Sequence, residues 1–447
     1  QYNTCLNGCK YCYANYSEEL VKDIVRNIVG LRILTCAPEA WAATVVNFAL
    51  DTADFGYTTR YEADDFEYLT KEMWSEDLRS LADAAFLLVD VVRELMDRPF
   101  SIENVKAFAD EFIENSLYLE TETYSETLID NVFEVLAIAL DLHVLEFIGG
   151  DLVDFAVEEY AGSLPIDLSF VEGAVVFEGL PEDIRTIGEI VKVVVLDLAV
   201  LDMVGEGFEL SYDDFELSEE NLGYVAEIIG LVGTLNVLAN YRAEIYSEVL
   251  TLAFEDMFGF EVTVDDMAYM EGKWDADNAT IQSVIVKLAG IFTEENKLDT
   301  VGNLLDTISN LTADEEHLYN VLLSTDNVNV ITDIISTLLT LEVIETFDDK
   351  LVNYLFDMLN DDAFIAELDI NFIEPLLTKE LLAHDILVIG DMINAVINVG
   401  LGEYLLTDDI KFVQVAELGA LFDAINDLAL LQENREDWMR VIGNAVM

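Results

Sequence analysis

Basic residues, prolines and, after residue 36, cysteines are scarce in this sequence. Lysine and arginine number 21 against 89 aspartates and glutamates, so the formal net charge is −68. Such an acidic surface repels nucleic-acid phosphates and anionic lipids, so we expect no nucleic-acid partner. Uncharged apolar runs stay below the ~20 residues of a membrane-spanning helix, which predicts no membrane insertion. Glycine-rich phosphate-binding loops are also lacking, so nothing in the sequence supports nucleotide binding.

What the chain has in abundance is apolar residues at helical spacing. They make up 53% of the 447 residues, enough for a large core despite the charge. Residues 78–96, LRSLADAAFLLVDVVRELM, show the stripe of a half-buried helix. Serine followed by acidic residues, at Ser75 and Ser218, predicts helix starts. The stretch 166–180 lies between two of the five prolines and is predicted to be a hairpin or an extended linker.

A short pattern, Leu-x-apolar-[Leu/Ile], recurs in the helical part of the chain. It begins at Leu142, Leu235, Leu341 and Leu428. Ten residues after each of these leucines stands another apolar residue: Leu152, Ile245, Leu351 and Trp438. Each copy predicts a helix end, a short turn and a returning helix. Helical hairpins bury their apolar faces by stacking on one another, so we predict an all-α fold, an irregular array of stacked hairpins similar to an α-solenoid.

A second repeated element is predicted to form short extended connectors between hairpins. Residues 207–215 (GFELSYDDF) and 259–267 (GFEVTVDDM) match closely, and 61–69 (YEADDFEYL) is a looser relative. Phe208 and Phe260 would anchor the connectors in the core. A hydroxyl such as Ser211 or Thr263, or the aspartate pair, would cap the next helix.

The composition changes near residue 30. Residues 1–30 carry three basic and three acidic side chains, so the entire net charge lies in the remainder. Three of the four cysteines occur in the first twelve residues. We predict a cysteine-motif segment at 1–30, a helical region at 31–160, hairpins with connectors at 161–270 and a C-terminal hairpin array at 271–447.

The first segment contains a candidate metal site. Cys5, Cys9 and Cys12 follow the spacing C-x3-C-x2-C, with Tyr11 before the last cysteine. Three thiolates on one tight loop can hold three irons of a [4Fe–4S] cluster. The fourth iron then stays open for S-adenosylmethionine, which the reduced cluster cleaves.

Residues 1–23, QYNTCLNGCKYCYANYSEELVKD, resemble the cysteine segment of an uncharacterised bacterial family with a radical-SAM-like cluster loop. The resemblance implies that Cys5, Cys9 and Cys12 are cluster ligands, and it implies a cytoplasmic iron–sulfur enzyme. In that family the segment follows the catalytic body, and residues after 30 lack the strand–helix alternation of a radical SAM barrel. Two alternatives stay open: a zinc site completed by Cys36, and a non-functional remnant, which we favour.

Other candidate ligands are interpreted as structural. His143, His317 and His384 each fall on a predicted helix and are expected to be satisfied structural histidines. Residues 274–280, WDADNAT, begin like a calcium loop with Asp275 and Asp277 but lack its later ligands and glycine, so a cap or turn is expected. Acid pairs predict weak divalent-cation binding at most; they are Asp213–Asp214, Asp265–Asp266, Asp361–Asp362 and Asp408–Asp409.

These observations favour a non-enzymatic protein. Residues 31–447 resemble, in style only, the acidic helical repeats of large bacterial surface proteins. The resemblance implies a scaffold or adhesive fragment of a larger secreted or cell-surface protein. Its expected partners are proteins or components of the cell envelope. A radical SAM-type [4Fe–4S] protein is the alternative hypothesis.

Overall fold

The all-α prediction is confirmed. The computed structural model describes residues 18–53, 57–96, 124–160, 179–203, 213, 215–258, 262–293, 298–309, 324–346, 372–399 and 418–446. Within these ranges the secondary structure is helical, and β pairing is limited to one isolated antiparallel bridge between Glu216 and Thr300. The extended stretch predicted at 166–180 and the phenylalanines Phe208 and Phe260 lie outside the described residues.

The chain forms two compact units. The first comprises residues 1–202 and 234–240, and the second comprises 203–233 and 241–447. The helical elements up to residue 203 are α1 (Glu18–Val29), α2 (Arg32–Thr35), α3 (Pro38–Ala53), η3 (Ala63–Phe66), α4 (Lys71–Leu95), α6 (Glu126–Leu140), α7 (Leu145–Tyr160), α8 (Leu180–Lys192), η8 (Val193–Asp197) and η9 (Val200–Met203). The later elements are α9 (Glu219–Thr234), α10 (Asn236–Phe258), η10 (Asp266–Met270), α11 (Trp274–Leu288), α12 (Val301–Ser309), α14 (Thr325–Leu339), η11 (Glu342–Thr346), η13 (Glu374–Leu376), α16 (Lys379–Val399), α18 (Leu418–Asp427), α19 (Ala429–Glu433) and α20 (Arg435–Val446). The four-part division predicted from composition stays a prediction.

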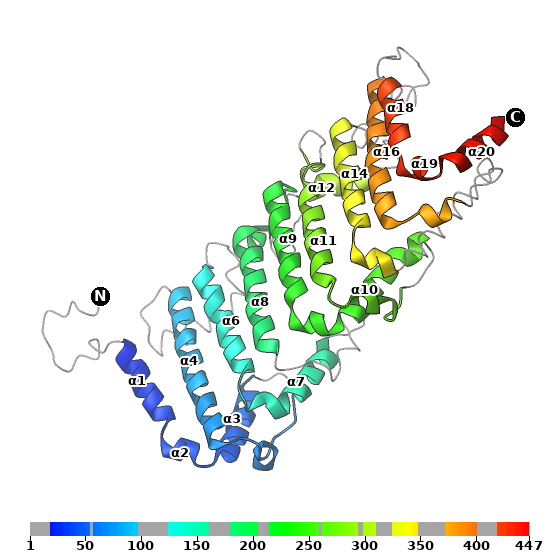
Figure 1. Ribbon diagram of the computed structural model, residues 1–447. Coiled ribbons are helices and arrows are strands. Elements are labelled where there is room, and N and C mark those ends of the chain that lie inside the picture. Colours follow the sequence, from blue (N-terminus) through cyan, green and yellow to red (C-terminus); the bar gives the residue numbers. More distant parts are fainter. Residues whose placement is uncertain are drawn as a thin grey trace, which may run out of the picture. The chain divides into compact units, whose positions relative to one another are not determined.

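Helices α4, α6 and α8 lie side by side in the first unit (Figure 1). Ion pairs between α6 and α8 show that these two helices run antiparallel. Arg185 Nε is 2.8 Å from Glu134 Oε2, and Lys192 Nζ is 2.8 Å from Asp130 Oδ1. The sequence numbers rise along one helix while they fall along the other, as in a stacked hairpin array.

The second unit repeats this arrangement with α11, α14, α16 and α18, which contact one another in chain order (Figure 1). Asn394 Nδ2 donates to Asn329 Oδ1 at 2.7 Å between α16 and α14. One helical turn from that asparagine pair, Gly390 of α16 faces Thr332 of α14. A Cβ built on the glycine would lie 2.6 Å from the Thr332 hydroxyl. Glycine therefore permits the close approach of these two helices.

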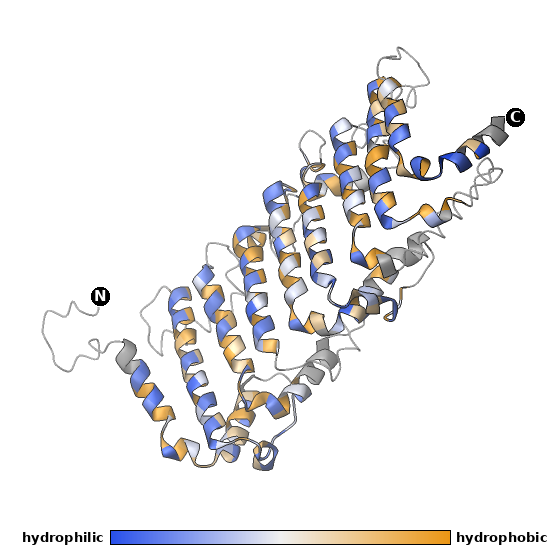
Figure 2. Ribbon diagram, in the orientation of Figure 1, coloured by the Kyte–Doolittle hydropathy of each residue, from blue (hydrophilic) through white to orange (hydrophobic). Residues whose placement is uncertain are grey.

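Apolar and polar residues alternate along each of these helices (Figure 2). The apolar faces form separate cores. The core of the first unit contains Trp74 and Phe66, which are 1% and 0% exposed. In the described part of the second unit, Met267 and Met270 are the most buried members of one such cluster.

Two of the predicted connectors take the same form. At Glu62 the backbone N–H donates to Asp65 Oδ2 at 2.7 Å, and the Glu62 side chain caps the same turn in return. At Thr263 the backbone N–H donates to Asp266 Oδ2 at 2.8 Å, and the Asp266 N–H donates to the Thr263 hydroxyl at 3.3 Å. Each reciprocal cap starts a short 3₁₀ helix, η3 or η10. Of the predicted capping side chains, Thr263 contacts the first residue of η10, and Ser211 lies outside the described residues.

The structure confirms the helix start predicted at Ser218 and contradicts the one predicted at Ser75. Ser218 accepts from the Asn221 N–H and begins α9. The helix start predicted at Ser75 is wrong, because α4 begins directly after Thr70. The Thr70 hydroxyl accepts from the Met73 N–H at 3.2 Å. Ser75 lies inside the helix and donates to the Lys71 carbonyl instead.

Helix packing continues across the composition break near residue 30. Helix α1 contacts α4, where Arg26 pairs with Asp83 at 3.0 Å. Lys22 lies over the ring of Phe86, 5.6 Å from its centroid. The second part of the predicted 1–30 segment is thus a helix of the array.

Candidate functional site

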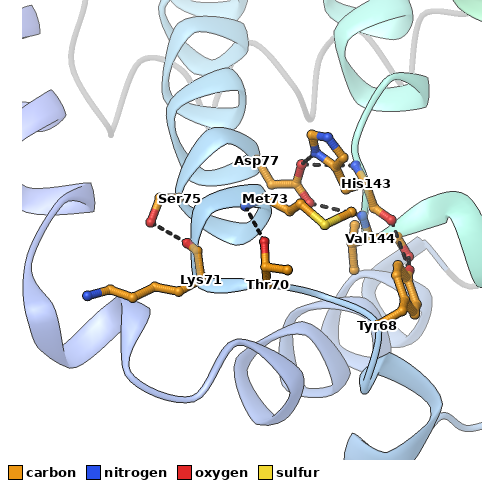
Figure 3. Close-up of polar contacts among 8 residues, drawn as sticks. All are labelled: Tyr68, Thr70, Lys71, Met73, Ser75, Asp77, His143 and Val144. Atoms are coloured by element: carbon orange, nitrogen blue, oxygen red, sulfur yellow. Dashed lines mark hydrogen bonds and ion pairs between the residues drawn. The ribbon is translucent and has the colours of Figure 1, made fainter.

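A buried aspartate on α4 joins two segments that are 66 residues apart in the sequence. Asp77 is 1% exposed. Its Oδ1 accepts from the His143 backbone N–H at 2.9 Å, and its Oδ2 accepts from the Val144 backbone N–H at 2.9 Å (Figure 3). These two amides begin the turn that follows α6. The carboxylate therefore caps that turn from the neighbouring helix, in the manner of a charge-assisted N-cap.

The same contact occurs three more times within the described part of the chain. Asp183 accepts from Asn236 and Val237 at 2.6 and 2.9 Å. Asp277 accepts from Glu342 and Val343 at 2.7 and 2.9 Å. Asp385 accepts from Ala429 and Leu430 at 2.7 and 3.0 Å. We call Asp77, Asp183, Asp277 and Asp385 the capping aspartates; their exposure ranges from 1% to 6%.

The capping aspartates explain the repeat seen in the sequence. The capped amides belong to the two residues that follow the repeat leucines Leu142, Leu235, Leu341 and Leu428. We name the helices that carry the aspartates A helices (α4, α8, α11 and α16) and those that precede the leucines B helices (α6, α9, α14 and α18). The predicted hairpin turns are thus real structural repeats, each fixed by a residue that the pattern did not include.

The A helices share a sequence signal that the leucine pattern missed. Tryptophan or leucine stands three residues before each capping aspartate, as in Trp74-x-x-Asp77 and Trp274-x-x-Asp277. The α4 and α16 segments are closer still, TKEMWSED and TKELLAHD. In both, the threonine caps the helix, with Thr378 accepting from the Leu381 N–H. These matches are visible in the sequence, but only the structure shows what the aspartate contacts.

Two polar side chains complete the turn at Asp77 (Figure 3). The Tyr68 hydroxyl lies 2.9 Å from the His143 carbonyl and 3.1 Å from the Val144 carbonyl, to which it donates. Burial raises the pKa of Tyr68 to about 12, so it stays a donor at neutral pH. The His143 Nδ1 lies 2.8 Å from Asp77 Oδ1. Partial burial alone would lower the pKa of His143, but the hydrogen bond and charge of Asp77, with Glu146 and Glu76, raise it above its ordinary value.

The predicted helical position is confirmed for His384, which lies on α16, and is wrong for His143, which lies in the turn between α6 and α7. His143 belongs to the turn capped by Asp77, and His384 Nδ1 lies 3.1 Å from Asp385 Oδ1. His317 lies outside the described residues. The local cap or turn predicted at residues 274–280 was wrong, because these residues form the first turns of α11. Asp277 instead caps the distant turn at Glu342, and Asp275 is an exposed residue of the first turn of α11.

The cysteine site cannot be placed, because Cys5, Cys9 and Cys12 lie outside the described residues. Cys36, the fourth ligand of the alternative zinc site, is exposed, and its thiol lies 3.4 Å from the Ile33 carbonyl. Among the described residues no three histidines, cysteines or acids come together to hold a metal ion. Of the acid pairs, Asp266 caps η10, whereas Asp361–Asp362 and Asp408–Asp409 are not described.

An open groove of about 650 Å³ lies between α9 and α11 in the second unit. Gly223 and Gly230 of α9 line one side, and Gln282 and Lys287 of α11 line the other. The Lys287 ammonium is already engaged, at 2.7 Å from Asp333 Oδ2 and 2.9 Å from the Thr337 hydroxyl. The groove is therefore lined by glycines and by a lysine whose charge is already paired with Asp333. Its lining residues do not form a converging set of catalytic groups.

One described helix, α16, is long and apolar enough to cross a membrane. It contacts α14 on one side and α18 on the other, and it buries Asp385, Gly390 and Asn394.

Among the described residues, the capping aspartates and both histidines make contacts that belong to the fold. Every capping aspartate spends both carboxylate oxygens on backbone amides, and the described histidines contact two of those aspartates. Comparisons with known proteins add no constraint, since no protein-family model, curated protein or solved structure matches this chain.

Proposed function

We propose that this chain is a non-enzymatic helical-repeat scaffold or adhesive segment of a larger acidic protein of the cell surface or the extracellular space. The repeated capping aspartate carries the proposal. Four turns, each at the end of a B helix, are capped in the same way from the neighbouring A helix, and such repetition of one contact is typical of a repeat array. Such arrays present extended surfaces to other macromolecules, and the carboxylate coat keeps this one soluble.

The acidic surface also supports the choice of partners. Nucleic acids and anionic membranes are repelled, so the partners are proteins or cell-envelope components with basic or neutral surfaces. Divalent cations would bind weakly and diffusely to the coat. For the cations, a melting temperature that rises with millimolar calcium beyond an ionic-strength-matched sodium control supports such binding, and equal melting temperatures refute it.

Antibody labelling of intact cells tests the location. Antibodies against residues 31–447 should label the source cells without permeabilisation, while a cytoplasmic marker stays unlabelled. Labelling that requires permeabilisation would refute a surface role. For the adhesive role, the folded chain should bind an isolated envelope fraction, whereas the doubly substituted Asp77→Ala, Asp277→Ala chain, which loses two capped turns, should bind it less.

The second candidate is a radical SAM-type iron–sulfur protein in the cytoplasm, with a [4Fe–4S] cluster on Cys5, Cys9 and Cys12. The motif C-x3-C-x2-C with Tyr11 is the observation that favours it. Anaerobic reconstitution with iron and sulfide should then give absorption at about 400 nm, from thiolate-bound iron. The Cys9→Ala variant should stay colourless, and a colourless wild-type chain would end this hypothesis.

A further inference from the structure

Each B helix faces the A helix of the next hairpin along a line that we call a seam. The described seams are α6–α8, α9–α11 and α14–α16. In two of them a side chain of the B helix packs onto a glycine that lies five residues after the capping aspartate. At the α6–α8 seam, a Cβ built on Gly188 would lie 2.9 Å from the Cβ of Phe133. At the α14–α16 seam, Thr332 takes the equivalent position against Gly390.

A polar pair closes the same two seams about one helical turn farther along. Lys192 of α8 lies 2.8 Å from Asp130 of α6. At the equivalent positions, Asn394 of α16 donates to Asn329 of α14 at 2.7 Å. Each of these closed seams therefore has two contacts between its helices, one at a glycine and one at a polar pair.

Among the described seams, the one between α9 and α11 has neither set of residues. Ala226 stands where the other B helices have Phe133 or Thr332, and Gln282 stands where the A helices have glycine. Gly223 and Val286 occupy the positions of the polar pairs. The groove of about 650 Å³ is lined by all four of these residues. It therefore coincides with the space that side chains fill in the two closed seams.

The α9–α11 seam widens from one end to the other. A Cβ built on Gly233, near the end of α9, would overlap the Asn278 amide. One built on Gly230 would lie 3.0 Å from the Gln282 amide nitrogen. One built on Gly223 would meet no described atom within 4 Å. The two helices are thus close at the C-terminal end of α9 and apart toward its N-terminal end.

The close end is also held by an arginine. The Arg242 guanidinium, on α10, donates to the Gly233 carbonyl of α9 at 2.5 Å and lies 3.8 Å from the Asp275 carboxylate of α11. At the open end, Lys287 of α11 pairs instead with Asp333 of α14 at 2.7 Å. Helix α11 is therefore tied to α9 at the close end and to α14 at the open end.

We infer that the α9–α11 seam is a hinge, at which the N-terminal end of α9 moves against α11 while the α6–α8 and α14–α16 seams stay closed. Opening breaks few contacts, because Gly223 and Ala226 have little side chain to lose contact with, and segments with few contacts open most readily. The pivot is the close end, where Arg242 and Asn278 donate to backbone carbonyls of α9. A small rotation there shifts the helices on either side, which suits a scaffold that adjusts to its partner.

Methyl relaxation dispersion, which detects motion on the μs–ms timescale of hinges, tests this on the full chain. The methyl groups of Leu231 and Val286 line the groove. Their dispersion amplitudes should be about threefold larger than those of Ile187 and Val388, which lie on the A helices of the two closed seams. Equal amplitudes at the four residues overturn the hinge.

Two variants that close the seam complete the test. Ala226→Phe with Gln282→Gly copies the packing of the α6–α8 seam and should lower the dispersion amplitude of Leu231 about threefold. Gly223→Asp with Val286→Lys copies the polar pair of that seam and should have the same effect. The second variant keeps the hinge testable if the first fails to fold.

A substitution outside the groove supplies the control. Glu219 is an exposed residue at the start of α9 and does not line the groove, so Glu219→Phe should leave the amplitude of Leu231 unchanged. The hinge is refuted if that amplitude keeps its wild-type value in both closing variants. It is also refuted if Glu219→Phe lowers the amplitude as much as they do.

Discussion

The turns that begin at Leu31 and Leu428 have the same local sequence plan but differ in what surrounds them. Both have a short helix, a longer helix and an indole N–H bonded to the carbonyl two residues after the leucine. Among the residues that the structure describes, a capping aspartate is found only at the second turn, where it is Asp385. The comparison separates two contributions: the local sequence forms the turn, and the neighbouring A helix buries it and satisfies its amides.

The largest expected effect comes from converting the capped turn into the uncapped one. Asp385→Ala leaves the Ala429 and Leu430 amides without their acceptor in a partly buried place. We expect the free energy of unfolding to fall by about 2–4 kcal/mol, because two bonds to a charged group are lost and their donors stay desolvated. Urea unfolding followed by far-ultraviolet circular dichroism measures it.

Asp391 supplies the matched control for that substitution. It is an exposed aspartate on the same helix, α16, so Asp391→Ala should change the free energy of unfolding by no more than about 0.5 kcal/mol. Equal effects of Asp385→Ala and Asp391→Ala would show that the cap contributes nothing beyond its charge.

The next effect compares equivalent apolar residues in a covered and an uncovered turn. Val144→Ala removes two methyl groups from a buried site and should cost about 2 kcal/mol. Ile33→Ala removes more carbon but from a side chain that is 68% exposed, and it should cost at most about 0.5 kcal/mol. A cost for Ile33→Ala as large as that for Val144→Ala would mean that Ile33 is already covered in the isolated chain.

The fold class and the hairpin turns could be predicted from sequence because both depend on local spacing. Helical stripes and the pattern at Leu142 and Leu341 are visible without any knowledge of contacts. The capping aspartates could not be assigned this way, since Asp77 and Asp277 contact amides more than 60 residues away, and 89 acidic residues give no reason to select those two. The sequence LRIL at Leu31 also fits the leucine pattern. Its equivalence to the turn at Leu428 rests on the bond from the Trp41 indole N–H to the Ile33 carbonyl, which only the structure shows.

The two tryptophans test whether the turn itself is local. Trp41→Phe and Trp438→Phe each delete one indole N–H bond to a backbone carbonyl while they keep an aromatic ring. We expect each to lower the free energy of unfolding by about 1 kcal/mol, and by similar amounts in the capped and uncapped turns. The Trp438 ring also packs edge-on against Phe372, 5.3 Å between centroids, a contact that phenylalanine can retain. A loss confined to Trp438→Phe would show that the turn depends on its aspartate after all.

The smallest effect is a pH dependence restricted to the turn at Leu142. The pKa of His143 is raised in the folded protein, since partial burial is outweighed by the hydrogen bond and charge of Asp77. A raised folded-state pKa adds stability that is fully present below the unfolded pKa of 6.5 and is lost as pH rises through the folded pKa.

His143→Gln keeps the capped amide and removes this contribution. Its deficit against wild type should therefore be largest near pH 5, less than about 1 kcal/mol because the imidazole is partly solvated, and should shrink above pH 6.5. Glu342 takes the place of His143 at the Asp277 turn, so Glu342→Gln should show no such loss between pH 5 and pH 8. Urea unfolding of the three chains across that range measures it, and a His143→Gln deficit that grows with pH would contradict the assigned role of Asp77.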